Sequence, residues 1–72
     1  MGNQFFAAWL RDRLAERGMS GSSLARRLGV AQPVVSAWLY GQEAPADPDI
    51  AKIADAFGMI IRDVQRVVGV TA

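Results

Sequence analysis

The sequence predicts an all-α fold of five short helices, and three observations support this prediction. Apolar residues recur at the three- and four-residue spacing of amphipathic helices in five separate segments. Glycines, prolines and helix-capping residues separate these segments from one another. Two segments, within 19–41, are joined only by a short break centred on Gly29, which is the pattern of a helix-turn-helix.

The composition limits the classes of function that the chain can perform. With 72 residues, 51% of them hydrophobic, we expect residues 1–72 to form one small domain. The chain contains neither cysteine nor histidine and no carboxylates clustered at a working spacing, so we expect no metal, no cofactor, no small-molecule substrate and no enzymatic activity. No apolar run approaches a membrane span and no secretory signal is present, so we expect a cytoplasmic protein without membrane contact.

The charges are unevenly distributed although the net charge is only +1. Residues 1–42 contain five arginines and two acidic residues, whereas residues 43–72 contain three basic and five acidic residues. The N-terminal part is therefore the better candidate for contact with a polyanion.

The first helix is expected at residues 4–17. Asn3 can cap its start, and Gly18 followed by Met19 is typical of a helix end at which the apolar residue packs back. The residues expected on its inward face are Phe6, Trp9, Leu10 and Leu14.

The second helix is expected to begin after Ser20, whose hydroxyl can accept a hydrogen bond from the amide of Ser22 or Ser23. The amides of this first turn are also a natural site for a phosphate group. The residues expected to face inward are Leu24, Ala25 and Leu28. Gly29 allows a left-handed residue after the helix, and Val30 can pack back under it.

The third helix is expected to begin near Gln32 and to end at Gly41. Pro33 is tolerated there, because the amides of a first helical turn need no partner within the helix. The residues expected to face inward are Val35, Trp38 and Leu39. Helical geometry then places Gln32, Pro33, Ser36, Ala37 and Tyr40 on the outward side, with Val34 on the flank. In a helix-turn-helix this outward side is the one that enters a DNA major groove.

The fourth helix is expected to start with Asp47 as its cap, to have Pro48 at its first position and to end near Phe57, where Gly58 closes it. Its expected inward residues are Ile50, Ile53, Ala54 and Phe57.

A last helix is expected from about residue 60 to 68, with Gly69 as its stop. It presents a broad apolar stripe that consists of Ile60, Ile61, Val64, Val67 and Val68. This is more apolar surface than one side of a small bundle readily covers, so these residues are expected to form a homodimer interface. Packing of the same residues into the core of one chain is the open alternative.

The positions of the key residues resemble the Cro and lambda-repressor-like helix-turn-helix family, also called Xre-type. The resemblance rests on a spaced pattern and covers nearly the whole chain: Met19-Ser20, Leu24-Ala25, Leu28-Gly29-Val30, Gln32, Val35-Ser36, Trp38, Gly41, Pro45 and 53–58. It implies a compact five-helix lambda-repressor-like domain with its helix-turn-helix at the second and third helices. It also implies a transcriptional regulator, usually a phage or bacterial repressor, that binds double-stranded DNA, often as a homodimer on an inverted repeat.

The resemblance also implies which residues contact DNA. The expected base-contacting residues are Gln32, Pro33, Val34 and Ala37, and Gln32 leads because its amide can form two hydrogen bonds with adenine. The expected backbone-contacting residues are Ser20, Gly21, Ser22, Ser36, Tyr40 and Gln42.

Three positions depart from the family pattern. Gly21 replaces a common glutamine that braces the recognition helix, Ala31 occupies a cap position without a capping side chain, and Glu43 brings a negative charge beside the expected phosphate contacts. Together with the apolar outward side of the third helix, they leave an alternative open. The chain could be a protein-interaction module on the same fold, with weak or no DNA binding.

Overall fold

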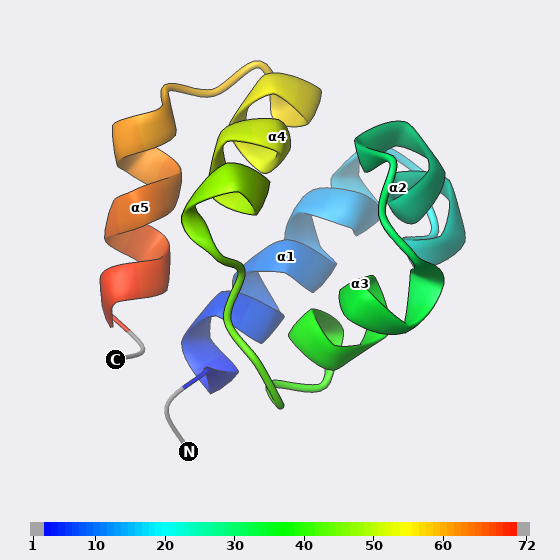
Figure 1. The fold of residues 1–72 in the computed structure, drawn as a ribbon, viewed down its shortest axis with the longest axis horizontal. Coiled ribbons are helices and arrows are strands. Elements are labelled where there is room, and N and C mark those ends of the chain that lie inside the picture. The colour runs from blue at the N-terminus through cyan, green and yellow to red at the C-terminus, as the bar shows by residue number, and fades with distance from the viewer. Residues whose placement is uncertain (1–2, 71–72) are drawn as a thin grey trace.

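Five α-helices and no strands make up residues 3–70, which are the residues that this computed structural model describes. Their bounds are α1 (Gln4–Glu16), α2 (Gly21–Leu28), α3 (Gln32–Leu39), α4 (Asp47–Phe57) and α5 (Ile61–Val70) (Figure 1). The predicted all-α, five-helix fold is therefore confirmed. None of the helices in this described range is long and apolar enough to cross a membrane.

The first helix lies at the centre of the arrangement and packs against α3 on one side and α5 on the other (Figure 1). α2 packs against both α3 and α4, and α4 packs against α5. The fully buried large side chains lie between these helices, and they are Phe6, Leu10, Leu24, Val35, Trp38, Ile53 and Val64. This core fixes the position of α3, because residues of α1, α2 and α3 share it.

Three helices end, as predicted, one or two residues before a glycine with left-handed backbone conformation. Gly18, Gly29 and Gly58 are all in the left-handed region, with φ of 60°, 73° and 65°. After each of them the next amide donates back to a carbonyl five residues earlier, as in the bond from Val30 to Ala25 (3.0 Å).

One predicted cap is confirmed only in its position, and another is wrong. Asn3 is the cap residue of α1, but its side chain makes no capping hydrogen bond. Ala46, rather than Asp47, is the cap residue of α4, because its backbone is extended and its carbonyl already accepts from the amide of Ile50 (2.9 Å). Asp47 is thus the first helical residue, where its carboxylate still opposes the positive end of the helix dipole.

The prediction that Gly69 ends the last helix is also wrong. α5 continues through Gly69 to Val70, because a glycine in a helix lowers helix propensity without blocking the backbone hydrogen bond. Gly69 does not have a positive φ, so it does not form the left-handed cap seen at the other helix ends.

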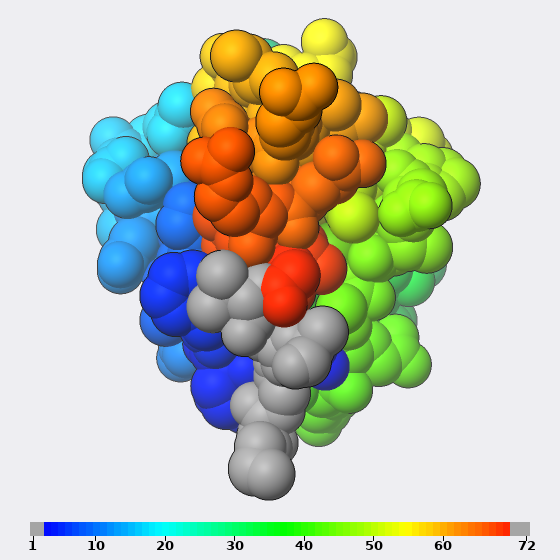
Figure 2. Space-filling view, turned by 90° about the vertical axis from the view of Figure 1, so that its left-hand side faces the viewer, coloured from blue at the N-terminus to red at the C-terminus, as the bar shows by residue number. Residues whose placement is uncertain are grey.

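The apolar stripe of α5 is divided between the core and the surface. Val64 has 0% exposure and belongs to the core, whereas Val67 and Val68 are half-buried against that core. Ile60, with 69% exposure, and Ile61 remain open to solvent at the start of the helix. The helix itself lies on the side of the molecule shown in Figure 2. The assignment of Val64 to a dimer interface is therefore corrected, since a buried side chain cannot contact a second chain.

Arg17 connects the end of α1 to the end of α4. Its guanidinium donates to the carbonyl oxygen of Phe57 (3.1 Å) and lies 4.8 Å from the centre of that phenyl ring. The Trp9 ring meets the same phenyl ring edge-on at 6.1 Å. This contact supplies a hydrogen bond to a carbonyl that has no partner within its own helix.

We expect Gly29→Ala to lower the free energy of unfolding by about 1–2 kcal/mol, because an L side chain is strained in the left-handed region. An added Cβ there would meet no atom within 4 Å, so the cost would come from the backbone alone. Gly69→Ala is the matched control: its Cβ would also meet no atom, but its φ is not positive, so stability should rise by up to about 1 kcal/mol. Urea denaturation of both variants tests this pair, and equal effects would contradict it.

Candidate nucleic-acid interface

The outward side of α3 is formed as the sequence predicts. Val35 and Trp38 are buried, and Leu39 is half-buried against the core. On the opposite side Gln32, Pro33 and Tyr40 are exposed, with Tyr40 reaching 71% exposure. Val34, Ser36 and Ala37 are half-buried. The four predicted base-contacting residues therefore lie on one short helix, where Gln32 and Pro33 are the most accessible.

The start of α2 has the predicted cap. The Ser20 hydroxyl accepts a hydrogen bond from the Ser23 amide (3.1 Å), and the Leu24 amide donates to the Ser20 carbonyl (3.0 Å). The other two amides of the first turn belong to Gly21 and Ser22 and are not used by these bonds. They are available to a ligand such as a phosphate group.

The start of α3 lacks any side-chain cap. Ala31 has the extended backbone of a cap residue, but its methyl group cannot accept a hydrogen bond. Neither α2 nor α3 has an acidic residue in its first turn, whereas α4 has Asp47 and Asp49 and α5 has Asp63. The positive dipole ends of the two helix-turn-helix helices are therefore not neutralised by the chain itself.

The corner between α3 and α4 brings further candidate residues to the surface. Gly41 takes a left-handed conformation (φ 73°), and the Gln42 amide then donates to the Ala37 carbonyl (2.9 Å). This turn leaves the side chains of Tyr40 and Gln42 exposed on either side of the glycine. The exposed Glu43 follows directly, so the negative charge noted in the sequence does lie beside these candidates.

The start of α2 lies against the end of α3. A Cβ atom added to Gly21 would lie 3.0 Å from Cδ1 of Leu39 and 3.7 Å from Cγ1 of Val35. The sequence identifies Gly21 only as the replacement of a bracing glutamine, and it does not predict this contact. The only signal for it in the sequence is a glycine at a helical position that does not need one.

None of the predicted DNA-contacting residues carries a charge, so the positive charge near them comes from other positions. Arg26 and Arg27 of α2 are exposed, and within residues 3–70 they form no ion pair. In α1, Arg13 pairs with Glu16 (2.6 Å) and is thereby partly neutralised. The two α2 arginines are therefore the free cations closest in sequence to the candidate surface.

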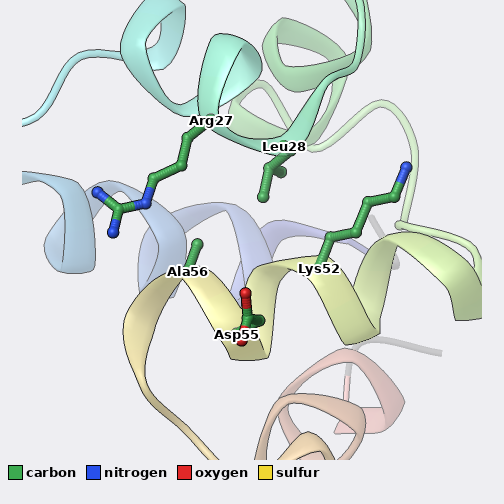
Figure 3. A pocket seen from close by; sticks show the side chains of 5 residues that line it. All are labelled: Arg27, Leu28, Lys52, Asp55 and Ala56. Carbon is green, nitrogen blue, oxygen red and sulfur yellow. The ribbon is translucent and has the colours of Figure 1, made fainter.

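Two surface hollows lie away from the outward side of α3. One, of about 150 Å³, lies between α2 and α4, where Arg27 and Lys52 extend from opposite walls above Asp55 (Figure 3). The other, of about 290 Å³, lies over Ser23 and Arg26. No group of three or more metal-ligating residues occurs in the described part of the chain. No α3 residue lines either hollow. The candidate site is therefore the exposed side of α3 together with the start of α2, rather than a pocket.

Comparison with known families agrees with this geometry. A family model described as helix-turn-helix matches residues 10–64, which is more than half of the chain and includes all of α2, α3 and α4. Comparisons with curated proteins and with solved structures gave no match.

Proposed function

The chain belongs to the helix-turn-helix family, which supports binding to double-stranded DNA, and from this premise we propose that it is a sequence-specific transcriptional repressor of phage or bacterial origin. In this proposal residues 1–72 act as one DNA-binding domain in the cytoplasm, and α3 enters the major groove. The observation that supports it best is the exposed outward side of α3, which carries Gln32 at its accessible start. The burial of Val35 and Trp38 leaves only that side free for a groove.

Gln32 is proposed as the principal base-reading residue. Its side-chain Nε2–H can donate to N7 of adenine while its Oε1 accepts from the exocyclic N6 amino group, which matches the edge of adenine in the major groove. Pro33, Val34 and Ala37 have no polar side-chain atom, so they would contribute contacts with thymine methyl groups and sensitivity to DNA shape.

The proposed backbone contacts come from two separate segments. Ser20, Gly21 and Ser22 form the start of α2, where the amides of Gly21 and Ser22 remain available, and Ser36 is half-buried on α3. Tyr40 and Gln42 extend from the corner after α3. Neutral donors of these kinds commonly position a protein on phosphates without reading sequence.

A protein-interaction module on the same fold is the second candidate, and one observation favours it. The outward side of α3 and the corner after it contain no basic residue, whereas Glu43 and Asp47 are exposed close by. A surface of this kind would be compatible with a protein partner, because phosphate binding usually relies on lysine and arginine.

We expect the wild-type protein to enrich a defined motif from a pool of random duplexes. Gln32→Ala should weaken binding to the enriched duplex by about 1–3 kcal/mol and leave binding to random duplex nearly unchanged, because base contacts specify sequence while backbone contacts do not. Fluorescence anisotropy measures both affinities. Gln65→Ala, a change at another exposed glutamine on α5, is the matched control and should alter neither affinity.

Equal losses on both duplexes would refute the base-reading role of Gln32. A pool without any enriched motif would favour the interaction module instead.

We further propose that the protein binds an inverted repeat as a homodimer through the start of α5. Ile60 and Ile61 are the large aliphatic side chains left exposed there, while Val67 and Val68 are half-buried farther along the helix. Two recognition helices would then lie about one DNA turn, roughly 34 Å, apart.

Sedimentation equilibrium tests the dimer. The wild-type protein should dimerise at high micromolar concentration, and Ile60→Asp should shift it to monomer, since a charge would be buried at the interface. Ala51→Asp, at an exposed position on α4, is the control for added charge. A wild-type protein that stays monomeric at these concentrations would contradict the dimer proposal.

A further inference from the structure

We propose that Leu39 is a positioning residue for DNA binding. It packs on the bare backbone of Gly21 and so sets the distance between the two segments that contact the DNA backbone. This inference rests on the proposed DNA-binding function and assigns to Leu39 a role that acts through its neighbours.

A side chain at residue 21 would crowd Leu39. A Cβ atom at Gly21 would lie 3.0 Å from Cδ1 of Leu39, which is closer than side-chain carbons normally approach. Gly21 is the first residue of α2 and Leu39 is the last residue of α3. With a side chain at residue 21, either the end of the Leu39 side chain would have to shift by a few tenths of an ångström or the two helix ends would have to move apart.

The backbone conformation does not require a glycine at this position. Gly29 and Gly41 have positive φ angles, but Gly21 does not, so any L-amino acid could adopt its conformation. Alanine would also favour the helix more than glycine does. The feature that glycine alone provides here is the space that Leu39 occupies.

The contact joins the two groups of proposed backbone contacts. Ser20 and Ser22 flank Gly21 on one side, and Tyr40 directly follows Leu39 on the other, with Gln42 two residues beyond it. All four of these flanking side chains are exposed, whereas Leu39 is half-buried. The donor–acceptor distance of a hydrogen bond can vary by only a few tenths of an ångström. Both segments can therefore bond to phosphates of one duplex only if the distance between the segments is fixed.

The test is Gly21→Ala, with Gly69→Ala as the matched control. Both substitutions add one methyl group to a helix, but the methyl group at residue 69 would meet no atom within 4 Å. We would measure affinity for a duplex enriched from a random pool by the wild-type protein, phosphate-ethylation interference on that duplex, and thermal melting. Gly21→Ala should weaken binding about tenfold, the equivalent of one or two hydrogen bonds. It should also lose interference at the phosphates of one segment while keeping its melting temperature, and Gly69→Ala should match the wild type in affinity and in interference.

A second substitution that restores DNA affinity would distinguish a positioning role from a general loss of folding. Leu39→Val shortens the side chain and removes the Cδ1 atom that the new methyl group would meet. The double variant with Gly21→Ala and Leu39→Val should return to within about threefold of the wild-type affinity and recover the lost interference, because the two effects are coupled.

Wild-type affinity for Gly21→Ala, or a double variant no better than Gly21→Ala, would overturn the inference while leaving the proposed function intact. A wild-type protein that binds no duplex would overturn the proposed function, and the inference with it.

Discussion

The burial of Val35 and Trp38 is the interaction on which the rest of the structure depends. α3 has only eight residues, so on its own it would be a marginal helix in water, and these two side chains hold it against the shared core of α1 and α2. Once they face inward, helical geometry leaves Gln32, Pro33 and Tyr40 outward. The presentation of the candidate DNA-reading surface is thus a consequence of core packing, and a change that loosened the core would disturb the surface without touching it.

Two kinds of positive charge lie near the candidate surface: the partial charges at the helix starts and the full charges of the arginines. The starts of α2 and α3 have no acidic residue in their first turns, so their dipoles favour an anion at the helix-turn-helix. The full positive charges nearest in sequence are those of the exposed Arg26 and Arg27 on α2. The exposed Glu43 adds a negative charge at the corner after α3. Short-range recognition would then depend on neutral groups held in a fixed geometry, while long-range attraction would depend on the arginines of the first 42 residues.

Local patterns in the sequence were sufficient to predict most of the fold. The helix ends at Gly18, Gly29 and Gly58 and the bond from Ser23 to Ser20 involve residues a few positions apart, so their chemistry is visible in the sequence. The errors at Asp47 and Gly69 each misplaced a helix end by one or two residues. The burial of Val64, the bond from Arg17 to Phe57 and the contact of Leu39 with Gly21 could not be predicted, because each depends on how distant segments pack. The DNA-contacting roles of the candidate residues remain predictions.

Equilibrium titration of the protein with duplex DNA over a series of salt concentrations tests the central claim most directly. A DNA-binding protein that neutralises phosphates releases counterions, so the logarithm of its affinity falls linearly with the logarithm of salt concentration, by roughly 0.9 per phosphate. With five arginines against two acidic residues in residues 1–42, the account predicts saturable binding with a slope of about −2 or steeper. Feeble binding at low salt that barely changes as salt is added would contradict it.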